Sequence, residues 1–437
     1  MIFRSTHHTS PPATFREALL RGLAPDGGLY IPEKIPLLPH LFGGRMHAET
    51  LHSVGHHIAS AFIDEIPGGV LRQIVERAWN FPIPLVRLEE GIFFLELFHG
   101  PTLAFKDVGA RFMAEAMSYF LSEGQNEVTI LVATSGDTGS AVAYGFHLAR
   151  NIVVYILYPS GKISMLQEQQ MTTLGGNIHA VEVEGTFDDC QRLVKESLAD
   201  TEILKVRTLT TANSMNLGRL LPQIAYYVWG SAQWQQMDPD GDTTLTVVVP
   251  SGNFGNLTAA AYAKWMGAPL GTLVAATNVN DVVPQYLATG SFTPRPSRTT
   301  LSNAMDVGNP SNLARLQALY GYDVERLRSD IAAASVTDEE TLAEIRNTYD
   351  RTGYILDPHT AVGVAAARTL LDRGSITSPV IVAATAHPAK FPDTVRRAID
   401  VEVPLPPALA DALLRTKIST RISPSFQEWK TLLLPKR

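Results

Sequence analysis

The sequence predicts an α/β protein built from parallel sheets in more than one lobe. Short apolar runs bounded by turn residues alternate with helix-like segments along most of the chain. Strands that are apolar on both faces are typical of parallel sheets covered by helices on both sides. The chain has 437 residues, too many for one ordinary core, so we expect two or three domains.

The expected elements follow in order from the N-terminus. Helical patterning marks residues 15–23 and 70–79, on either side of a turn-rich stretch, and the proline-rich residues 80–91 indicate a boundary. Helices are then predicted at residues 140–150, 163–176 and 187–200. The predicted strands are residues 128–134, 152–159, 177–185, 244–250, 272–277 and 379–385.

Composition and charge narrow the class of function. The net charge is −7, so no overall basic field would recruit nucleic acid. The sequence has no run of apolar residues long enough to span a membrane and no signal-peptide core, so we expect neither a membrane partner nor export. Cys190 is the one cysteine, which excludes an internal disulfide and a cysteine-rich metal site. These features predict a cytoplasmic protein, and no metal constellation is evident.

The first candidate ligand site follows the strand at 244–250. Glycines and asparagines come next, and an alanine-rich helix pattern begins directly after them. Glycine backbone can approach a ligand closely, and a helix N-terminus offers unpaired N–H groups with a partial positive charge. These features favour a phosphate monoester, although a tight turn with asparagine caps would give the same pattern. The loop consists of Gly252, Asn253, Phe254, Gly255 and Asn256.

A second loop of the same design follows the strand at 128–134. It is rich in hydroxyl groups and glycines, and a helix pattern begins after it. Such groups can hold a carboxylate or the rim of a ring, and capping of the helix is the alternative. Asp137 differs, because its ionised side chain would repel an anion, and it could instead accept a hydrogen bond. The candidates in this loop are Thr134, Ser135, Asp137 and Thr138.

Polar side chains also stand in three other places. A threonine follows the strand near 379–385, where its hydroxyl could bond a ligand or the backbone. An arginine with amide and hydroxyl neighbours lies in residues 210–223 and suits a second phosphate or a carboxylate. A lysine follows the strand at 152–159, and a solvated loop is the alternative for the last two places. The residues are Thr385, Lys162, Ser214, Asn216 and Arg219.

Lys106 has an unusual setting. It follows Leu103, Ala104 and Phe105, and a helix pattern begins right after it. Burial lowers the pKa of a lysine, because it disfavours the charged form, and the neutral amine can form a Schiff base with an aldehyde. A surface lysine lying over Phe105 is the alternative. Together with a phosphate loop and a neutral hydroxyl at a strand end, Lys106 favours a pyridoxal phosphate site.

At these residues the sequence resembles threonine synthase, a pyridoxal-phosphate enzyme of fold type II, over nearly the whole chain. The longer bacterial and fungal branch is the more similar. The stretches that carry the resemblance occur in the family's order: "ATFREALLRGLAPDGGLYIP", "ELFHGPTLAFKDVGARFMA", "ATSGDTGSAV", "PSGNFGN", "ATNVNDVVP", "LSNAMDVGNPSN" and "ATAHPAKFP".

The resemblance implies two open parallel-sheet lobes covered by helices, with an N-terminal helical domain. The N-terminal domain would span residues 1–80, and the smaller, mobile lobe residues 112–185. The larger, cofactor-binding lobe would combine residues 81–111 with residues 186–437.

The resemblance also implies a role for each candidate. Lys106 would carry pyridoxal 5′-phosphate through a Schiff base, the loop at 252–256 would bind its phosphate, and Thr385 would face its ring nitrogen. Asp137 stands where relatives often have an asparagine near the 3′ oxygen of the cofactor. The substrate carboxylate would be held by Thr134, Ser135 and Thr138. The candidates for the substrate phosphate are Lys162, Ser214, Asn216 and Arg219.

The implied reaction converts O-phospho-L-homoserine and water into L-threonine and phosphate by β,γ-replacement, the last step of threonine biosynthesis. Lys106 would move the protons. Two alternatives stay open: a phospholyase of the same fold that releases 2-oxobutyrate, and an inactive relative that binds phosphorylated metabolites. We expect a small-molecule substrate, no nucleic acid or membrane partner, and a monomer or small homo-oligomer.

Overall fold

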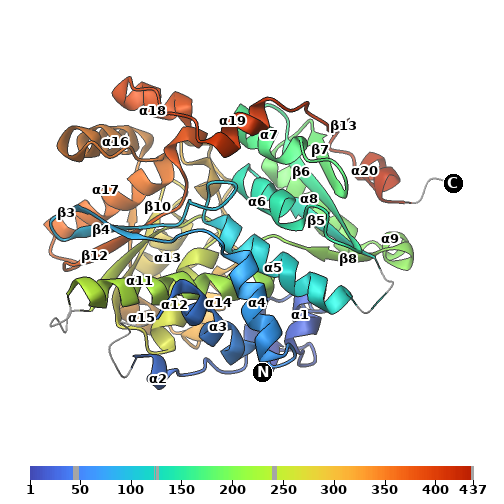
Figure 1. The fold of residues 1–437 in the computed structure, drawn as a ribbon, viewed down its shortest axis with the longest axis horizontal. Coiled ribbons are helices and arrows are strands. Elements are labelled where there is room, and N and C mark those ends of the chain that lie inside the picture. The colour runs from blue at the N-terminus through green and yellow to red at the C-terminus, as the bar shows by residue number, and fades with distance from the viewer. Residues whose placement is uncertain (43–48, 123, 125–126, 239–243, 435–437) are drawn as a thin grey trace.

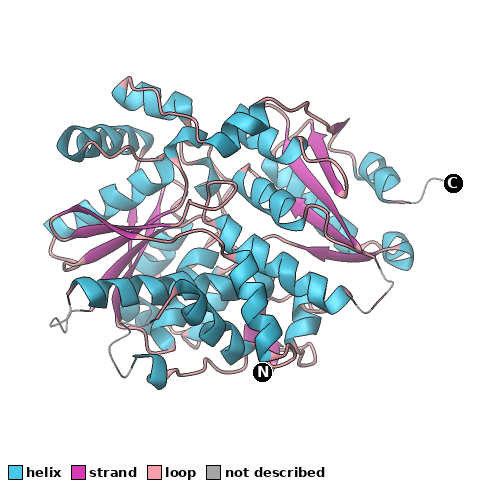
Figure 2. Ribbon diagram, in the orientation of Figure 1, coloured by secondary structure: helices cyan, strands magenta, loops and turns pink. Residues whose placement is uncertain are grey.

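The computed structural model describes residues 1–42, 49–122, 124, 127–238 and 244–434. Two sheets, each flanked by helices, lie beside one another, and an N-terminal domain packs below them in the view of Figure 1. Figure 2 shows the strands gathered in these two separate groups, with a third, short pair near the N-terminus. The predicted α/β class is confirmed.

The larger sheet has six strands in the order β11-β10-β9-β12-β4-β3. All neighbours are parallel except β3 and β4, which form an antiparallel hairpin at the edge. Purely parallel pairing was expected, and the hairpin arises because Gly91, with φ +74°, lets the chain reverse at once. The strands are β3 (Leu85–Glu89), β4 (Ile92–Glu96), β9 (Leu245–Pro250), β10 (Leu270–Thr277), β11 (Ile331–Ser335) and β12 (Val380–Ala384).

The central strands β9 and β12 are buried along their whole length, as expected for strands with helices on both faces. The helices of this lobe are α11 (Ile224–Met237), α12 (Gly255–Trp265), α13 (Val282–Thr289), α14 (Leu313–Leu319), α15 (Val324–Asp330), α16 (Asp338–Thr352), α17 (Pro358–Asp372) and α18 (Pro392–Ile399). Short 3₁₀ turns are η1 (Leu221–Gln223), η2 (Asn303–Met305) and η3 (Pro388–Lys390).

The smaller sheet has five parallel strands in the order β13-β7-β6-β5-β8. It extends beyond the range 112–185 expected for this lobe, because it takes a strand from residues 208–211 and another from the C-terminal segment. The strands are β5 (Val128–Ala133), β6 (Ile152–Pro159), β7 (Ile178–Val183), β8 (Thr208–Thr211) and β13 (Thr420–Ile422). Its helices are α6 (Asp137–Phe146), α7 (Met165–Thr172), α8 (Phe187–Ala199), α9 (Thr201–Val206) and α20 (Phe426–Leu433).

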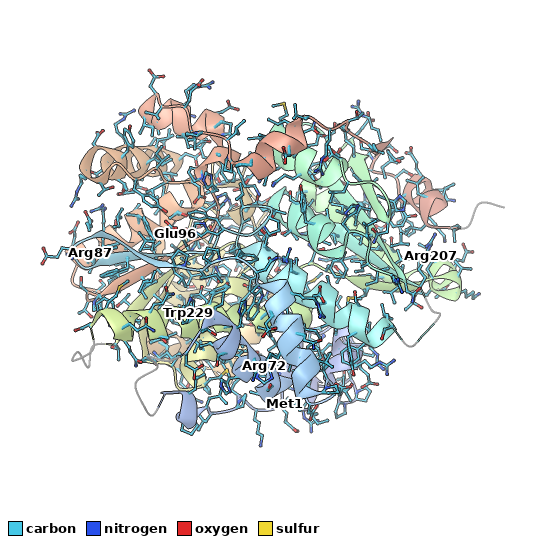
Figure 3. All side chains as sticks on the ribbon, viewed as in Figure 1. Met1, Arg72, Arg87, Glu96, Arg207 and Trp229 are labelled. Carbon is cyan, nitrogen blue, oxygen red and sulfur yellow. The ribbon has the colours of Figure 1, made fainter. Side chains whose placement is uncertain are left out.

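Arg207 ties the C-terminal segment to the smaller sheet. It lies beside α9 at the edge of that sheet (Figure 3), where its Nε donates to the carbonyl of Leu433. Its Nη1 donates to Oγ1 of Thr129 on β5 at 3.1 Å. The last helix is therefore part of the smaller lobe, although it follows the larger lobe in sequence.

The remaining helices connect the lobes and the N-terminal domain. Helix α5 (Lys106–Leu121) contacts α4 of the N-terminal domain, α6 of the smaller lobe and α10, so the helix is held by three others. The N-terminal domain consists of β1 (Phe3–Ser5), β2 (Tyr30–Pro32), α1 (Phe15–Arg21), α2 (Pro39–Phe42), α3 (Leu51–Phe62) and α4 (Gly68–Ala78). The two short connecting helices are α10 (Leu217–Leu220) and α19 (Pro407–Leu413).

The predicted elements agree with the structure to within a few residues at most ends. Helix α6 begins three residues before the predicted range 140–150, at Asp137 itself, and α7 is shorter than the predicted range 163–176. In the part of the chain that the structure describes, no helix has both the length and the apolar character needed to cross a bilayer.

Candidate active site

One pocket lies where the loops after β5, β9 and β12 meet the start of α5. These loops come from both sheets and all follow the carboxyl ends of parallel strands, where ligands of open α/β sheets bind. The pocket gathers most of the residues that the sequence singled out. They are Lys106, Thr134, Ser135, Asp137, Thr138, Ser214, Arg219, Gly252, Asn253, Phe254, Gly255, Asn256 and Thr385.

The backbone before Lys106 is fixed against the end of β12. The N–H of Phe105 donates to the carbonyl of Thr385 at 2.9 Å, and the N–H of His387 donates to the carbonyl of Leu103 at 3.0 Å. Leu103 has φ +58°, a left-handed conformation that makes the chain turn sharply before the helix. These contacts place Lys106 at the first position of α5 and close to Thr385.

The amine of Lys106 is set up as a nucleophile. Burial lowers its pKa from 10.5 to about 8, and Asp137 partly opposes this shift while Arg219 and Lys390 add to it. Among the residues described, Lys106 Nζ has no hydrogen-bond partner, and it lies 5.9 Å from the centre of the Phe105 ring. A lysine with this pKa is substantially neutral at slightly alkaline pH and can attack an aldehyde.

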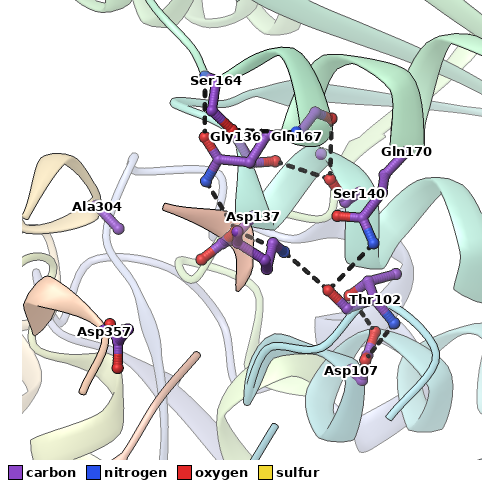
Figure 4. Close-up of polar contacts among 12 residues, drawn as sticks. Thr102, Asp107, Gly136, Asp137, Ser140, Ser164, Gln167, Gln170, Ala304 and Asp357 are labelled. Carbon is purple, nitrogen blue, oxygen red and sulfur yellow. Dashed lines mark hydrogen bonds and ion pairs between the residues drawn. The ribbon is translucent and has the colours of Figure 1, made fainter. Parts of the chain in front are cut away.

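Asp137 belongs to a buried polar network that the sequence did not reveal. Its Oδ1 lies 2.7 Å from Nζ of Lys390 and accepts a hydrogen bond from Nε2 of Gln167 at 2.8 Å. Figure 4 shows Asp137 between Gln167 and the loop that carries Thr102, whose carbonyl accepts from Lys390 Nζ at 2.8 Å. The pKa of Asp137 is held well below its usual range because the attraction of Lys390 and Lys106 outweighs the cost of burial. Asp137 is therefore a paired carboxylate.

The same network reaches Asp107, the residue after Lys106. Asp107 accepts hydrogen bonds from the N–H of Thr102 at 2.8 Å and from its hydroxyl at 2.6 Å. Burial raises the pKa of Asp107 to about 6 despite these bonds. The closed loop from Thr102 to Asp107 holds the first turn of α5 in place, as Figure 4 shows.

The loop at 252–256 has the shape and chemistry of an anion cradle. A side chain at Gly252 would bring a Cβ to 2.6 Å from the carbonyl oxygen of Ala304, so only glycine fits there. Phe254 has φ +61° and is the cap residue just before α12, whose first N–H groups have no intrahelical partner. Within the described ranges, Nδ2 of Asn256 is buried without an acceptor. Unpaired donors at a helix N-terminus fit a phosphate group.

Thr385 is a free hydroxyl on the wall of the pocket. Its side chain is buried, and in the described part of the chain its Oγ1 has no hydrogen-bond partner. Its own N–H donates to Oγ1 of Thr360 at 3.3 Å, which fixes the backbone at the end of β12. An uncharged hydroxyl in this place suits a neutral ring nitrogen.

Arg219 and Thr134 line the pocket in different ways. Arg219 is buried, donates from Nη1 to the carbonyl of Ala212 at 2.6 Å, and leaves its Nε without an acceptor among the described residues. Burial lowers its pKa to about 10. Oγ1 of Thr134 accepts from the N–H groups of Gly136 at 2.9 Å and Gly139 at 2.8 Å, so this hydroxyl caps α6. Of these two residues, Arg219 is therefore the better suited to bind an anion.

Lys162 and Asn216 lie outside the pocket wall. Lys162 is exposed in the turn after β6. Asn216 was a candidate beside Arg219, but it is the cap of α10, and its Oδ1 accepts from the N–H of Gly218 at 2.9 Å. Its Nδ2 donates to two backbone carbonyls, of Leu19 and Thr211, so the whole amide is used in holding the chain.

Two further residues in or near the pocket could not be identified from the sequence. Lys390 follows Thr385 closely in the sequence and pairs with the buried Asp137. His359 lines the pocket, with Nδ1 2.8 Å from Asp357 and Nε2 accepting from the N–H of Ala304 at 3.2 Å. This pairing places its proton on Nδ1. Within the described ranges, no group of three His, Cys, Asp or Glu side chains is arranged to hold a metal.

A buried lysine with a lowered pKa, a glycine-rich loop at a helix N-terminus and a neutral hydroxyl line one pocket between two largely parallel sheets. This arrangement fits a pyridoxal-phosphate-dependent enzyme of fold type II. The family model described as pyridoxal-phosphate dependent enzyme matches residues 78–385. The models of the threonine synthase N terminus and C-terminal region match residues 2–79 and 360–432. The chain belongs to the threonine synthase family.

Individual relatives agree with this assignment over the full length. The threonine synthase of Haemophilus influenzae is 43% identical, with 98% of each chain covered. The crystal structure of the Escherichia coli threonine synthase has a TM-score of 0.92 and 40% identity, with 99% of each chain covered. A pyridoxal-phosphate-bound threonine synthase from Brucella melitensis has a TM-score of 0.91 and 36% identity, covering 99% of this chain and 98% of that one. The predicted family, fold class, enzyme class and cofactor are confirmed.

Proposed function

We propose that this chain converts O-phospho-L-homoserine and water into L-threonine and inorganic phosphate in the cytoplasm, as the last step of threonine biosynthesis. The proposal rests on one observation. Lys106 lines the same pocket as two separate sets of groups that can bind an anion. One set is the 252–256 loop, and the other includes the buried guanidinium of Arg219. A phosphorylated cofactor and a phosphorylated amino acid together require two such sets.

The residues present fit pyridoxal phosphate. Lys106 Nζ would bond its aldehyde carbon, the loop at 252–256 would bind its phosphate, and Thr385 would face its ring nitrogen. Asp137, neutralised by Lys390, would lie beside the ring without adding net charge. When bound, the cofactor supplies an electron sink that stabilises negative charge on substrate carbon.

Lys106 is placed to carry protons once the substrate amine has taken its place. A general acid–base group works best when its pKa is near the working pH, and the pKa of Lys106 is lowered to about 8. The amine can then accept a proton from one substrate carbon and return it to another. The hydroxyls of Ser135 and Thr138, after β5, would bind the substrate carboxylate, and Thr134 supports them by capping α6.

Arg219 would bind the phosphate that leaves. Its guanidinium is buried, so its attraction for a dianion is weakly screened, and Ser214 adds a hydroxyl on the same wall. We leave Lys162 and Asn216 out of this site, because neither lies on the pocket wall and the amide of Asn216 is fully used.

The test is to identify the product that the cofactor-loaded protein forms from O-phospho-L-homoserine in ¹⁸O-labelled water. We expect L-threonine with the label in its hydroxyl group and unlabelled phosphate, because water adds to the β carbon and phosphate leaves with its bridging oxygen. A dominant yield of 2-oxobutyrate and ammonia would instead make the chain a phospholyase. Labelled phosphate with homoserine would mean simple ester hydrolysis, and no turnover would make the chain a binding protein. Lys106→Ala is the matched inactive control.

A further inference from the structure

Two adjacent tyrosines of α11 converge on one atom of the cradle. The hydroxyl oxygens of Tyr226 and Tyr227 each lie 2.5 Å from Oδ1 of Asn256. Tyr226 is 0% exposed, Tyr227 is 2% exposed and Asn256 is 5% exposed, so water cannot replace these contacts. The three side chains form a small, closed polar cluster directly behind the 252–256 loop.

The oxygen of the Asn256 amide is the end that faces the tyrosines. Both contacts are O–H···O hydrogen bonds, in which each phenol donates to Oδ1. Burial raises the pKa of both phenols well above its usual value, so both keep the proton that they donate. An amide oxygen has two lone pairs, and two donors fill them.

The nitrogen of this amide is turned away from the two phenols. Asn256 lines the pocket, and among the residues described its Nδ2 has no acceptor. A buried N–H without an acceptor is costly, so such a group indicates a missing partner. We propose that Tyr226 and Tyr227 are positioning residues, which hold the Asn256 amide so that its Nδ2 donates a hydrogen bond to the phosphate of pyridoxal phosphate. The proposal rests on the assignment of the 252–256 loop to that phosphate.

The cluster also connects the 252–256 loop to Arg219. The Oη of Tyr226 lies 3.1 Å from Oε1 of Gln223, and Nε2 of Gln223 donates to the carbonyl of Arg219 at 2.7 Å. Gln223 and Arg219 both line the pocket. Removal of one phenol leaves the amide held by the other, because both phenols bond the same oxygen. Gln223 is an alternative acceptor for Tyr226. The effect of removing both should exceed the sum of the single effects.

The test compares the affinity of the full chain, freed of cofactor, for pyridoxal phosphate and for pyridoxal. Both probes react with Lys106, but pyridoxal has no phosphate. We expect Tyr226→Phe/Tyr227→Phe to weaken pyridoxal phosphate binding by about 10-fold or more, the loss expected for one hydrogen bond to a charged group. Binding of pyridoxal should change less than about 2-fold, and each single variant should weaken the phosphorylated probe by less than about 3-fold. Tyr262→Phe is the matched control, because Tyr262 is 1% exposed and makes no hydrogen bond with described residues.

A second variant keeps the test decisive if the double variant does not fold. Asn256→Asp retains the size of the side chain and the acceptors for both phenols but removes the donor. It should weaken pyridoxal phosphate and spare pyridoxal. Equal losses for both probes, or wild-type affinity of Asn256→Asp for pyridoxal phosphate, would overturn the proposal. No turnover is involved, so a chain that bound its cofactor in this way but made no threonine would contradict only the proposed function.

Discussion

Nζ of Lys390 lies 2.7 Å from Oδ1 of Asp137, and both side chains are buried. Lys390 belongs to η3, after the last strand of the larger sheet, and Asp137 begins α6 of the smaller lobe. The pair therefore links the two lobes behind the pocket. It also allows a carboxylate to stand next to a site that binds anions, because the neighbouring ammonium cancels its charge.

Lys390→Met should strongly destabilise the protein. It would leave the buried Asp137 carboxylate without the cation that is bonded to it, and loss of one partner of a buried pair costs about 3–5 kcal/mol. The double variant Asp137→Asn/Lys390→Met leaves no unpaired charge and should recover part of this loss. Urea unfolding measures both. Arg4→Met is the control, since the Arg4–Glu33 pair is exposed and its loss should cost less than ~1 kcal/mol. Equal free energies of unfolding for Lys390→Met and wild type would show that the pair does not stabilise the fold.

Lys106→Met should stabilise the cofactor-free protein at neutral pH. The folded pKa of Lys106 is about 8, below its ordinary 10.5, so between these values the unfolded chain binds a proton that the folded chain does not. Wild-type stability should thus rise with pH from about 8 to about 10.5, and below pH 8 it carries the full penalty. The variant should be more stable there by up to about 3 kcal/mol, since one pKa unit corresponds to ~1.4 kcal/mol. Denaturant unfolding at several pH values measures the difference, and a constant difference from pH 7 to 10.5 would contradict the lowered pKa.

Gly252→Ala should damage the cradle. The new Cβ would stand 2.6 Å from the carbonyl oxygen of Ala304 and 2.8 Å from Cα of Met305, both of them backbone atoms that cannot simply rotate away. Overpacking of this kind costs about 1–3 kcal/mol. We expect lower thermal stability and weaker retention of pyridoxal phosphate on dialysis. Gly69→Ala is the control, because nothing lies within 4 Å of a Cβ there. If both variants kept the cofactor equally well, the close approach at Gly252 would not matter.

Arg315→Lys should loosen the wall of the pocket. The guanidinium of Arg315 is fully buried and donates to the carbonyls of Tyr30 at 3.0 Å, Ser214 at 3.2 Å and Met215 at 2.7 Å. A lysine keeps the charge but cannot reproduce this fork of donors. We expect a loss of about 2–3 kcal/mol in urea unfolding, with carbonyls left unpaired in the interior. Arg326→Lys, on the exposed face of α15, should change nothing measurable, and similar behaviour of the two variants would contradict the role of Arg315.

The candidates that the sequence could predict lie where a helix or strand begins or ends, because local sequence patterns mark such positions. Lys106 begins a helix, the 252–256 loop joins a strand to a helix, and Thr385 follows a strand. Parallel sheets bring such boundaries to one edge, so local patterns were sufficient to bring most candidates together. Asn216 is an exception, because α10 begins directly after it and makes it the cap of that helix.

The features of the site and fold that the sequence could not predict depend on contacts between distant segments. The sequence gives no sign that Asp137 pairs with Lys390, which lies far along the chain. Nothing in the sequence distinguishes Tyr226 and Tyr227, and only the fold shows their hydroxyls meeting Asn256. Strands β8 and β13 have four and three residues, too short for a periodic signal, so their place in the smaller sheet was not readable.

The most direct test of the site is to locate the residue to which the cofactor is attached. Reduction of the cofactor-loaded protein with borohydride, followed by proteolysis and mass spectrometry, locates the attached group. We predict a single phosphopyridoxyl group on Nζ of Lys106. Attachment at any other lysine, Lys390 and Lys162 included, would contradict the account.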